Sequence, residues 1–108
     1  MTQKMPSQSS FLKDRQSFFD EGMDILEAKN HDYAGIQNPW ANFLSVEAVG
    51  LNPMEAMLGR MMDKMSRLGR LIKNPAKVKG ETIHDTFQDL ANYANLADGL
   101  YRYLLERK

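Results

Sequence analysis

The chain contains no cysteine, which excludes disulfide bonds, thiolate metal sites and cysteine nucleophiles. This lack fits a reducing compartment. The chain also has no apolar run near the roughly 18 residues that a membrane-spanning helix needs. Its first ten residues carry no apolar segment of a secretory signal. We therefore expect a cytoplasmic protein without a membrane partner.

Neither sign of charge is in excess, because 14 basic residues balance 14 acidic ones. A balanced chain lacks the overall field of a protein that coats nucleic acid, so we expect no nucleic-acid polymer as partner. Hydrophobic residues make up 43% of the 108 positions, which is typical of one globular domain. We expect a flexible tail over residues 1–9 and a single domain over residues 10–108.

β-Branched residues are few, and apolar residues recur at spacings of three and four, as in helices. The pattern predicts an all-α fold, an up-and-down bundle of three long helices and one short one. The expected helices span residues 11–28, 40–49, 53–74 and 82–106. Their expected caps are Ser9 or Ser10, Asn52 before Pro53, and Thr82 with Asp85. The apolar stripes predicted to form the core are Phe11, Leu12, Phe18, Phe19, Met23 and Leu26 on the first long helix, Met54, Met57, Leu58, Met61, Met65, Leu68 and Ile72 on the second, and Ile83, Phe87, Leu90, Ala94, Ala97, Tyr101 and Leu104 on the last.

Carboxylates recur along the last expected helix, where Glu81, Asp85 and Asp89 share one strip between the core stripe and solvent. Carboxylates at this spacing repel each other, and a cation among them would offset the repulsion. Mg²⁺ is the natural candidate, with Asp63 as a further ligand and with Glu81 and Asp85 as the catalytic residues. The alternative is a solvated face that pairs with basic neighbours.

Basic residues lie on one face of the helix before it, at Arg60, Lys64 and Arg67. Arginine can bind phosphate through two hydrogen bonds and lysine as a point charge, so these side chains are candidate phosphate ligands. The alternative is a set of structural ion pairs. Exposed pairs contribute only about 0–1 kcal/mol, so stability alone is a weak reason to collect them.

The predicted loop between the first two helices combines a cation, an acceptor and aromatic rings. Its candidate base- and sugar-binding residues are Lys29, Asp32, Tyr33, Trp40 and Asn42. Aromatic rings stack on bases, and asparagine reads base edges. The alternative for Trp40 is that it caps the core of the bundle.

Four ordered blocks of residues together carry a family resemblance. They are Lys29-x-x-Asp32-Tyr33-x-Gly35, Trp40-x-Asn42-Phe43, Arg60-x-x-Asp63-Lys64-x-x-Arg67-Leu68 and Glu81-x-x-x-Asp85-x-x-x-Asp89-Leu90-x-Asn92-Tyr93. This series resembles the nucleotide modification associated domain 1 family, small proteins of phages and bacteria. More distantly, the chain is similar to the MazG-like all-α nucleoside triphosphate pyrophosphohydrolases.

In the MazG-like group, acidic residues on two helices hold Mg²⁺ while water attacks between the α- and β-phosphates. The run Asp20-Glu21-x-x-Asp24 is similar to the first acidic motif of that group. Glu81-x-x-x-Asp85 is similar to the second but has one additional residue. The resemblance therefore implies an all-α fold and a preference for nucleotide phosphates.

The expected function is Mg²⁺-dependent processing, such as pyrophosphohydrolysis, of a nucleotide or deoxynucleotide phosphate. The compartment implied by the resemblance is the cytoplasm of a bacterium or a phage-infected host. One alternative is a nucleotide-binding protein without catalysis, such as a phage factor that sequesters a nucleotide. Another is a structural or adaptor bundle. We also expect a homo-oligomer, a dimer or larger, because a bundle this small gains core by pairing.

Overall fold

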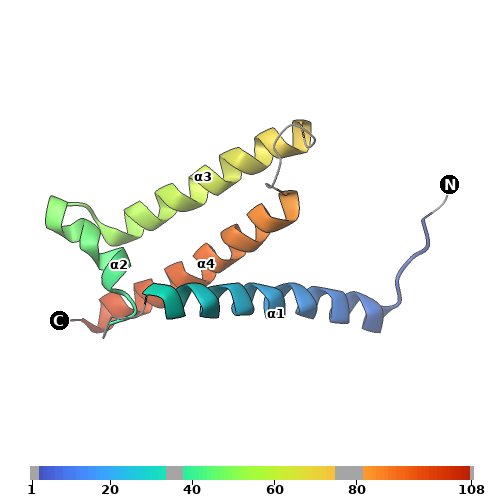
Figure 1. Ribbon diagram of the computed structural model, residues 1–108, viewed down its shortest axis with the longest axis horizontal. Coiled ribbons are helices and arrows are strands. Elements are labelled where there is room, and N and C mark those ends of the chain that lie inside the picture. Colours follow the sequence, from blue (N-terminus) through green and yellow to red (C-terminus); the bar gives the residue numbers. More distant parts are fainter. Residues whose placement is uncertain (1–2, 34–37, 75–81, 108) are drawn as a thin grey trace.

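The computed structural model describes residues 3–33, 38–74 and 82–107 of the chain, which form helices and connecting segments (Figure 1). The elements in order are α1 (Gln8–Tyr33), α2 (Ala41–Leu44), the short 3₁₀ helix η1 (Ser45–Val49), α3 (Pro53–Lys73) and α4 (Ile83–Glu106). No strand occurs within these three ranges, so the all-α prediction is confirmed. None of the helices in them is long and apolar enough to cross a membrane.

The first helix begins earlier and ends later than the sequence pattern predicted. Its cap is Ser7, not Ser9 or Ser10, because the Ser7 hydroxyl accepts the backbone N–H of Ser10 at 3.1 Å. At the other end the helix continues to Tyr33. The residues between Ala28 and Tyr33 include neither glycine nor proline, so nothing in them stops the helix. The predicted tail, residues 1–9, therefore overlaps the first two residues of α1.

The other helix starts agree with the prediction. The Asn52 side chain accepts the backbone N–H groups of Met54 and Glu55 at 2.8 and 3.2 Å. The Thr82 hydroxyl accepts the N–H of Asp85 at 2.8 Å. The single short helix expected over residues 40–49, before Asn52, is instead α2 followed by η1, and it ends at Gly50 with a φ of +81°.

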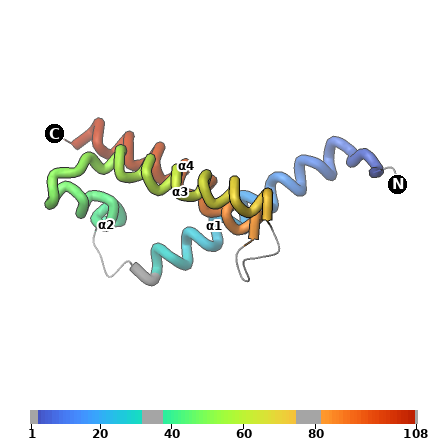
Figure 2. Tube along the Cα trace, turned by 90° about the horizontal axis from the view of Figure 1, so that it is seen from above, coloured from blue at the N-terminus to red at the C-terminus, as the bar shows by residue number. Residues whose placement is uncertain are grey.

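The helix pair α3–α4 is the centre of the molecule. The two helices run antiparallel and lie side by side in both views, joined by the largest contact in the fold (Figures 1 and 2). The C-terminal half of α1 runs beside α4 in the same direction, whereas its N-terminal half projects past the other helices (Figure 1). Figure 2 shows α2 and the C-terminal half of α1 on the same side of the α3–α4 pair.

The apolar core is small and lies between α3 and α4. Among the described residues, the buried hydrophobic ones are Met57, Leu68, Leu71, Ala97 and Leu100, and Pro53 is buried at the start of α3. Several residues of the predicted core stripes are exposed instead: Phe11, Leu12, Phe19, Met23, Leu58, Met65, Ile72, Phe87 and Tyr101. In α3 and α4 the apolar residues spread over more than one face, and the partner helix covers only one of those faces.

The contact between α1 and α4 is polar. The Gln88 side chain is 1% exposed, and its Nε2 donates to the Phe18 carbonyl at 2.9 Å and to Glu21 Oε2 at 3.2 Å. Asn92 Nδ2 donates to the Gly22 carbonyl at 3.0 Å. A Cβ at Gly22 would lie 2.6 Å from Gln88 Oε1. Glycine at this position therefore sets how closely the two helices approach.

An ion pair joins η1 to the end of α4. Arg107 donates from both terminal nitrogens to the two carboxylate oxygens of Glu47, at 2.9 and 2.8 Å. This hydrogen-bonded guanidinium lowers the pKa of Glu47 from its ordinary value. The pair ties the connection before α3 to the C-terminal end of the chain.

Candidate functional site

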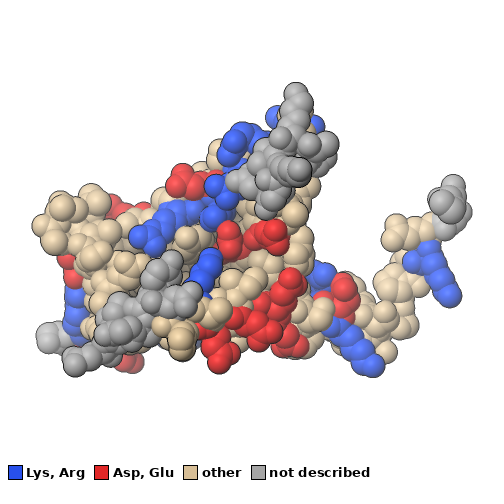
Figure 3. Space-filling view, viewed as in Figure 1, with Lys and Arg blue, Asp and Glu red and all other residues tan. Residues whose placement is uncertain are grey.

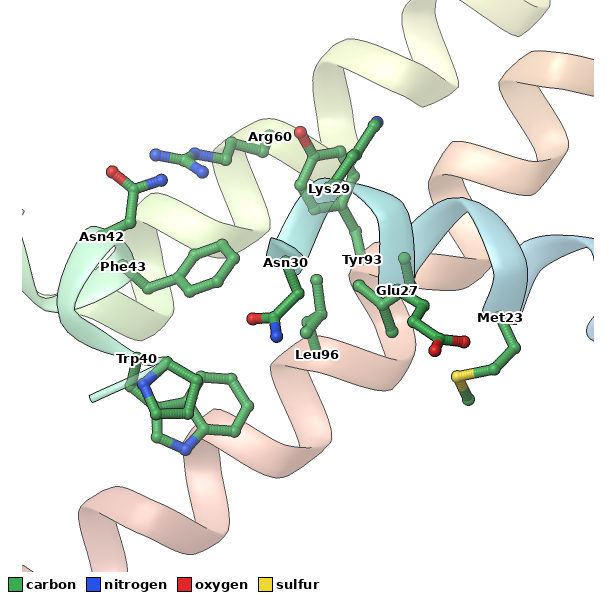
Figure 4. Close-up of a pocket in the computed structure, with 12 residues that line it drawn as sticks. Met23, Glu27, Lys29, Asn30, Trp40, Asn42, Phe43, Arg60, Tyr93 and Leu96 are labelled. Atoms are coloured by element: carbon green, nitrogen blue, oxygen red, sulfur yellow. The ribbon is translucent and has the colours of Figure 1, made fainter. Parts of the chain in front are cut away.

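A cavity of about 520 Å³ lies between the C-terminal half of α1, the segment around α2, and the α3–α4 pair (Figure 4). Its wall includes Lys29, Asn30, Trp40, Phe43, Arg60 and Tyr93. Cavities that bind small organic ligands usually measure about 300–1,000 Å³ and combine an apolar lining with a few polar groups. The size and the lining of this cavity both suit a ligand of that class.

Aromatic rings form one part of the wall. Trp40 is held in place by Asn38, by the backbone of α4 at Gly99 and by Phe43. Its backbone N–H donates to Asn38 Oδ1 at 2.9 Å, and Asn38 Nδ2 donates to the Tyr103 hydroxyl at 3.1 Å. The indole also lies directly on the backbone of α4, where a Cβ at Gly99 would come within 2.8 Å of Trp40 Cη2. The ring centre of Phe43 lies 6.1 Å from that of Trp40. The chain therefore fixes an aromatic platform.

Cationic side chains lie beside the aromatic rings. The guanidinium carbon of Arg60 is 5.4 Å from the ring centre of Phe43, within the range of a cation–π contact. Lys29 lines the same cavity with its side chain 59% exposed (Figure 4). Lys64 Nζ lies over the ring of Tyr93, 6.0 Å from the ring centre. Positive charge and aromatic surface thus meet at one wall.

Asp89 is the point where the acidic and basic strips of the sequence meet. Its carboxylate is 2.9 Å from Lys64 Nζ and 3.8 Å from Lys29 Nζ, and its side chain is 29% exposed. Each oxygen faces one ammonium group. In this arrangement Asp89 balances the two lysines and holds them near the cavity.

The structure describes two of the other three predicted metal ligands. The side chains of Asp63 and Asp85 are exposed, and Glu81 lies outside the described residues. Across ranges 3–33, 38–74 and 82–107, no three acidic or histidine side chains form a group that could hold a metal ion. Mg²⁺ needs carboxylate oxygens that are free to coordinate it. Both oxygens of Asp89 face lysine ammonium groups, so a cation would have to compete with Lys64 and Lys29 for this carboxylate.

Several predicted binding residues do come together. Lys29, Trp40, Asn42 and Arg60 line the cavity, and Lys64 lies next to it. Arg67 is half-buried further along the same side of α3. Asp32 and Tyr33 belong to the last turn of α1, but their side chains lie outside the described part of the structure.

Apart from Lys29, the contribution of α1 to the cavity was missed. Met23, Leu26, Glu27 and Asn30 line it, at spacings of three, one and three residues that place them on one helical face. The sequence pattern ended this helix at Ala28, before Asn30. A helix drawn to Tyr33 would have shown this face and its polar groups.

The charges on this side of the molecule are separated. Figure 3 shows Lys and Arg gathered over α3 and Asp and Glu gathered over the middle of α1. One of the acids on α1, Glu21, lies 3.0 Å from His84 Nε2. The predicted run Asp20-Glu21-x-x-Asp24 therefore includes a residue that pairs with α4.

No protein-family model, curated protein or solved structure matches this chain. The functional interpretation therefore depends on the cavity and the charges around it.

Proposed function

We propose that this chain binds a nucleotide in the cavity, with the base against the aromatic wall and the phosphates on the basic side chains. The observation that carries this proposal is the meeting of Trp40, Phe43 and Tyr93 with Arg60 and Lys29 around one cavity of about 520 Å³. A base needs a flat apolar surface, and phosphate needs cations. The cavity offers both within the reach of one mononucleotide.

The base stacks near Trp40, whose indole is braced on α4 at Gly99. Stacking on an aromatic side chain contributes about 1–3 kcal/mol per base and tolerates every base, because each has a π face. Asn30 and Asn42 supply amide groups at the cavity wall. Either amide can donate and accept, so these two residues are the source of any preference among bases.

The phosphates lie near Arg60 and Lys29. Within the described residues, Arg60 has a cation–π contact with Phe43 but no ion pair, so its donors are open to a new acceptor. Lys29 is 3.8 Å from Asp89, a long contact that a phosphate oxygen can replace. Lys64 stays with Asp89 at 2.9 Å and adds positive potential.

A second candidate function is Mg²⁺-dependent hydrolysis of the same nucleotide. Glu27 lines the cavity, and acidic residues continue from it along α1, which favours a cation in this region (Figure 3). Glu81, Asp85, Asp89 and Asp63 remain the proposed ligands. Metal binding there would require Asp89 to leave its lysines. On this proposal the chain belongs to the nucleotide modification associated domain 1 family, and its helices form an up-and-down bundle.

The test uses the only tryptophan, Trp40, as the reporter. Titration with nucleotides and deoxynucleotides in EDTA should quench its fluorescence. Arg60→Gln should weaken affinity at least about tenfold, because a charge-assisted hydrogen bond contributes roughly 1.5–3 kcal/mol. The matched control is Arg70→Gln, which removes an exposed arginine from the same helix. Equal effects of the two variants, or no quenching with any nucleotide, would contradict the proposal.

Repeating the titration with Mg²⁺ and analysing products separates binding from hydrolysis. Binding in EDTA without turnover supports the nucleotide-binding protein. Turnover that needs Mg²⁺ and is lost in Asp85→Ala, with helicity unchanged, supports the hydrolase. An adaptor bundle predicts no response in either buffer.

A further inference from the structure

One side of the α3–α4 pair is apolar and uncovered. On α3 the exposed residues are Leu58, Met62, Met65 and Ile72, with exposures between 51% and 65%. On α4 they are Phe87, Tyr101 and Leu105, with exposures between 45% and 58%. We call these seven residues the open face. Arg60 and Arg67 project from the other side of α3, and Gln88 and Asn92, which bind α1, from the other side of α4. The open face is therefore opposite the α1–α2 side and the cavity.

The spacing on α3 is that of a helix–helix seam. Leu58, Met62, Met65, Gly69 and Ile72 follow one another at steps of four, three, four and three residues. Apolar residues repeating every 3.5 residues on average present one continuous seam to a neighbouring helix. On α4 the same pattern runs at steps of four, three, four, three and four and holds five apolar residues and one acid: Phe87, Ala91, Ala94, Asp98, Tyr101 and Leu105. This periodicity predicts a partner that lies along the helices.

The solvent-exposed surface of the chain is larger than that of a typical monomer of its mass, which agrees with a missing partner. The chain exposes 8579 Å², whereas a monomer of its mass is expected to expose about 6,100 Å². Its radius of gyration is 17.0 Å, against about 13 Å for a globular domain of this length. The excess surface is roughly 2,400 Å², part of it on the projecting half of α1. Even half of this excess per chain would match an obligate dimer interface.

Charge is sparse on this side of the α3–α4 pair, where Asp98 is the one charged residue of the two seams. None of the seven residues of the open face is charged, whereas charged side chains of both signs cover the α1–α2 side (Figure 3). Asp98 shares a helix face with Leu105, seven residues later, and it pairs with Arg102, whose Nε is 3.4 Å from Asp98 Oδ2. An apolar centre with a polar rim is the usual composition of a protein–protein interface.

We propose that the open face binds a second copy of this chain, so that two α3–α4 pairs form one four-helix core. The partner is a second copy because the fold itself is incomplete: five buried hydrophobic residues are few to offset the conformational entropy of the described helices. A partner on which folding depends must be present whenever the chain is made. Two identical apolar faces also complement each other in a two-fold dimer.

The dimer leaves the candidate nucleotide cavity exposed to solvent, because the cavity is on the opposite side of the α3–α4 pair. Dimerisation and nucleotide binding are therefore separate properties. Failure of one proposal would not decide the other.

The test is the mass of the chain in solution by light scattering at micromolar concentrations. We expect twice the 12.4 kDa of one chain. Met62→Glu should raise the dimer dissociation constant at least about a hundredfold, because it buries an unpaired charge at a cost of several kcal/mol. The matched control Met5→Glu changes an 85% exposed methionine outside the open face and should leave the mass unchanged.

Two further measurements apply if Met62→Glu fails to fold. The thermal midpoint of the natural chain should rise with chain concentration, because association stabilises the folded state by mass action. The variant Met62→Cys, a single thiol in a chain without cysteine, should form a covalent dimer with a flexible bismaleimide, and Ser17→Cys on the projecting half of α1 should not. A folded chain of 12.4 kDa at these concentrations, or a dimer that Met62→Glu leaves intact, would overturn the proposal.

Discussion

Two glycines set the distances on which the fold and the cavity depend. Gly22 lies against Gln88 and Asn92, and Gly99 lies against Trp40, each closer than a Cβ allows. In contrast, a Cβ at Gly59 would meet nothing within 4 Å. Glycine in a helix normally costs about 0.5–1 kcal/mol relative to alanine. At Gly22 and Gly99 this cost is offset by close packing.

We predict that Gly22→Ala destabilises the chain by about 1–3 kcal/mol, because overpacking a filled contact outweighs the gain in helix propensity. Gln88 is 1% exposed and holds the Phe18 carbonyl, so it has little room to move away. Urea denaturation measures the change. The control Gly59→Ala should stabilise by up to about 1 kcal/mol. If both variants stabilise equally, the α1–α4 contact is looser than described.

Gly99→Ala should displace Trp40, since the new Cβ would lie 2.8 Å from Trp40 Cη2. We expect the fluorescence of this single tryptophan to shift to longer wavelength as the indole becomes more exposed. Nucleotide binding should weaken in the same variant, because the aromatic platform moves. An unchanged emission spectrum would argue against contact between the indole and α4.

The start of α3 depends on Asn52, whose side chain accepts two backbone N–H groups. We predict that Asn52→Ala lowers the free energy of unfolding by about 1 kcal/mol, the usual cost of removing such a cap. Asn74→Ala at the other end of the same helix is the control and should have a small effect. Equal losses in chemical denaturation would show that the Asn52 cap contributes nothing specific.

The ion pair between η1 and the end of α4 predicts how the stability of the folded chain changes with pH. Arg107 lowers the pKa of Glu47 in the folded chain. The resulting stabilisation is therefore complete above the unfolded pKa, about 4.3 for glutamate, and is lost as pH falls through the folded value. Glu47→Gln should remove the part of the acid-induced loss of stability that comes from protonation of Glu47. Urea midpoints between pH 7 and pH 3 measure it, with Glu106→Gln expected to behave as the natural chain.

Signals that act within one turn of helix could be predicted from sequence. The caps at Asn52 and Thr82 are of this kind and are confirmed. The end of α1 was wrong because polar residues without glycine or proline do not stop a helix. The apolar stripes were only partly right, since a helix with apolar residues on two faces does not reveal which face its own chain covers.

The sequence could identify candidate binding residues by their chemistry, but it could not show how these residues are arranged in space. Lys29, Trp40 and Arg60 were each selected for their chemistry, and the fold brings them to one cavity. The pairing of Asp89 with two lysines agrees with the alternative of ion-paired faces, but the sequence did not identify the partners, because they depend on the approach of α1 and α3 to α4. Sequence spacing orders groups along one helix, whereas a site needs the distances between helices.

The molecule as a whole divides into a packed part and a projecting part. The described residues from Ser9 to Ser17 in α1 are all exposed, and Figure 1 shows this half of the helix beyond the α3–α4 pair. We predict that its amide hydrogens exchange much faster than those of α3 and α4, because an isolated helical segment of this length is marginal in water. Hydrogen exchange with mass spectrometry tests this. Slow exchange there would show that another chain covers the segment.

The open face also bears on how much of this protein a cell keeps. The rate of dimer formation is second order in chain concentration. When few chains are made, each new chain therefore spends longer with its open face exposed to chaperones and proteases. Faster synthesis shortens that wait. On the dimer proposal, abundance would therefore rise more steeply than the rate of translation until most chains have found a copy.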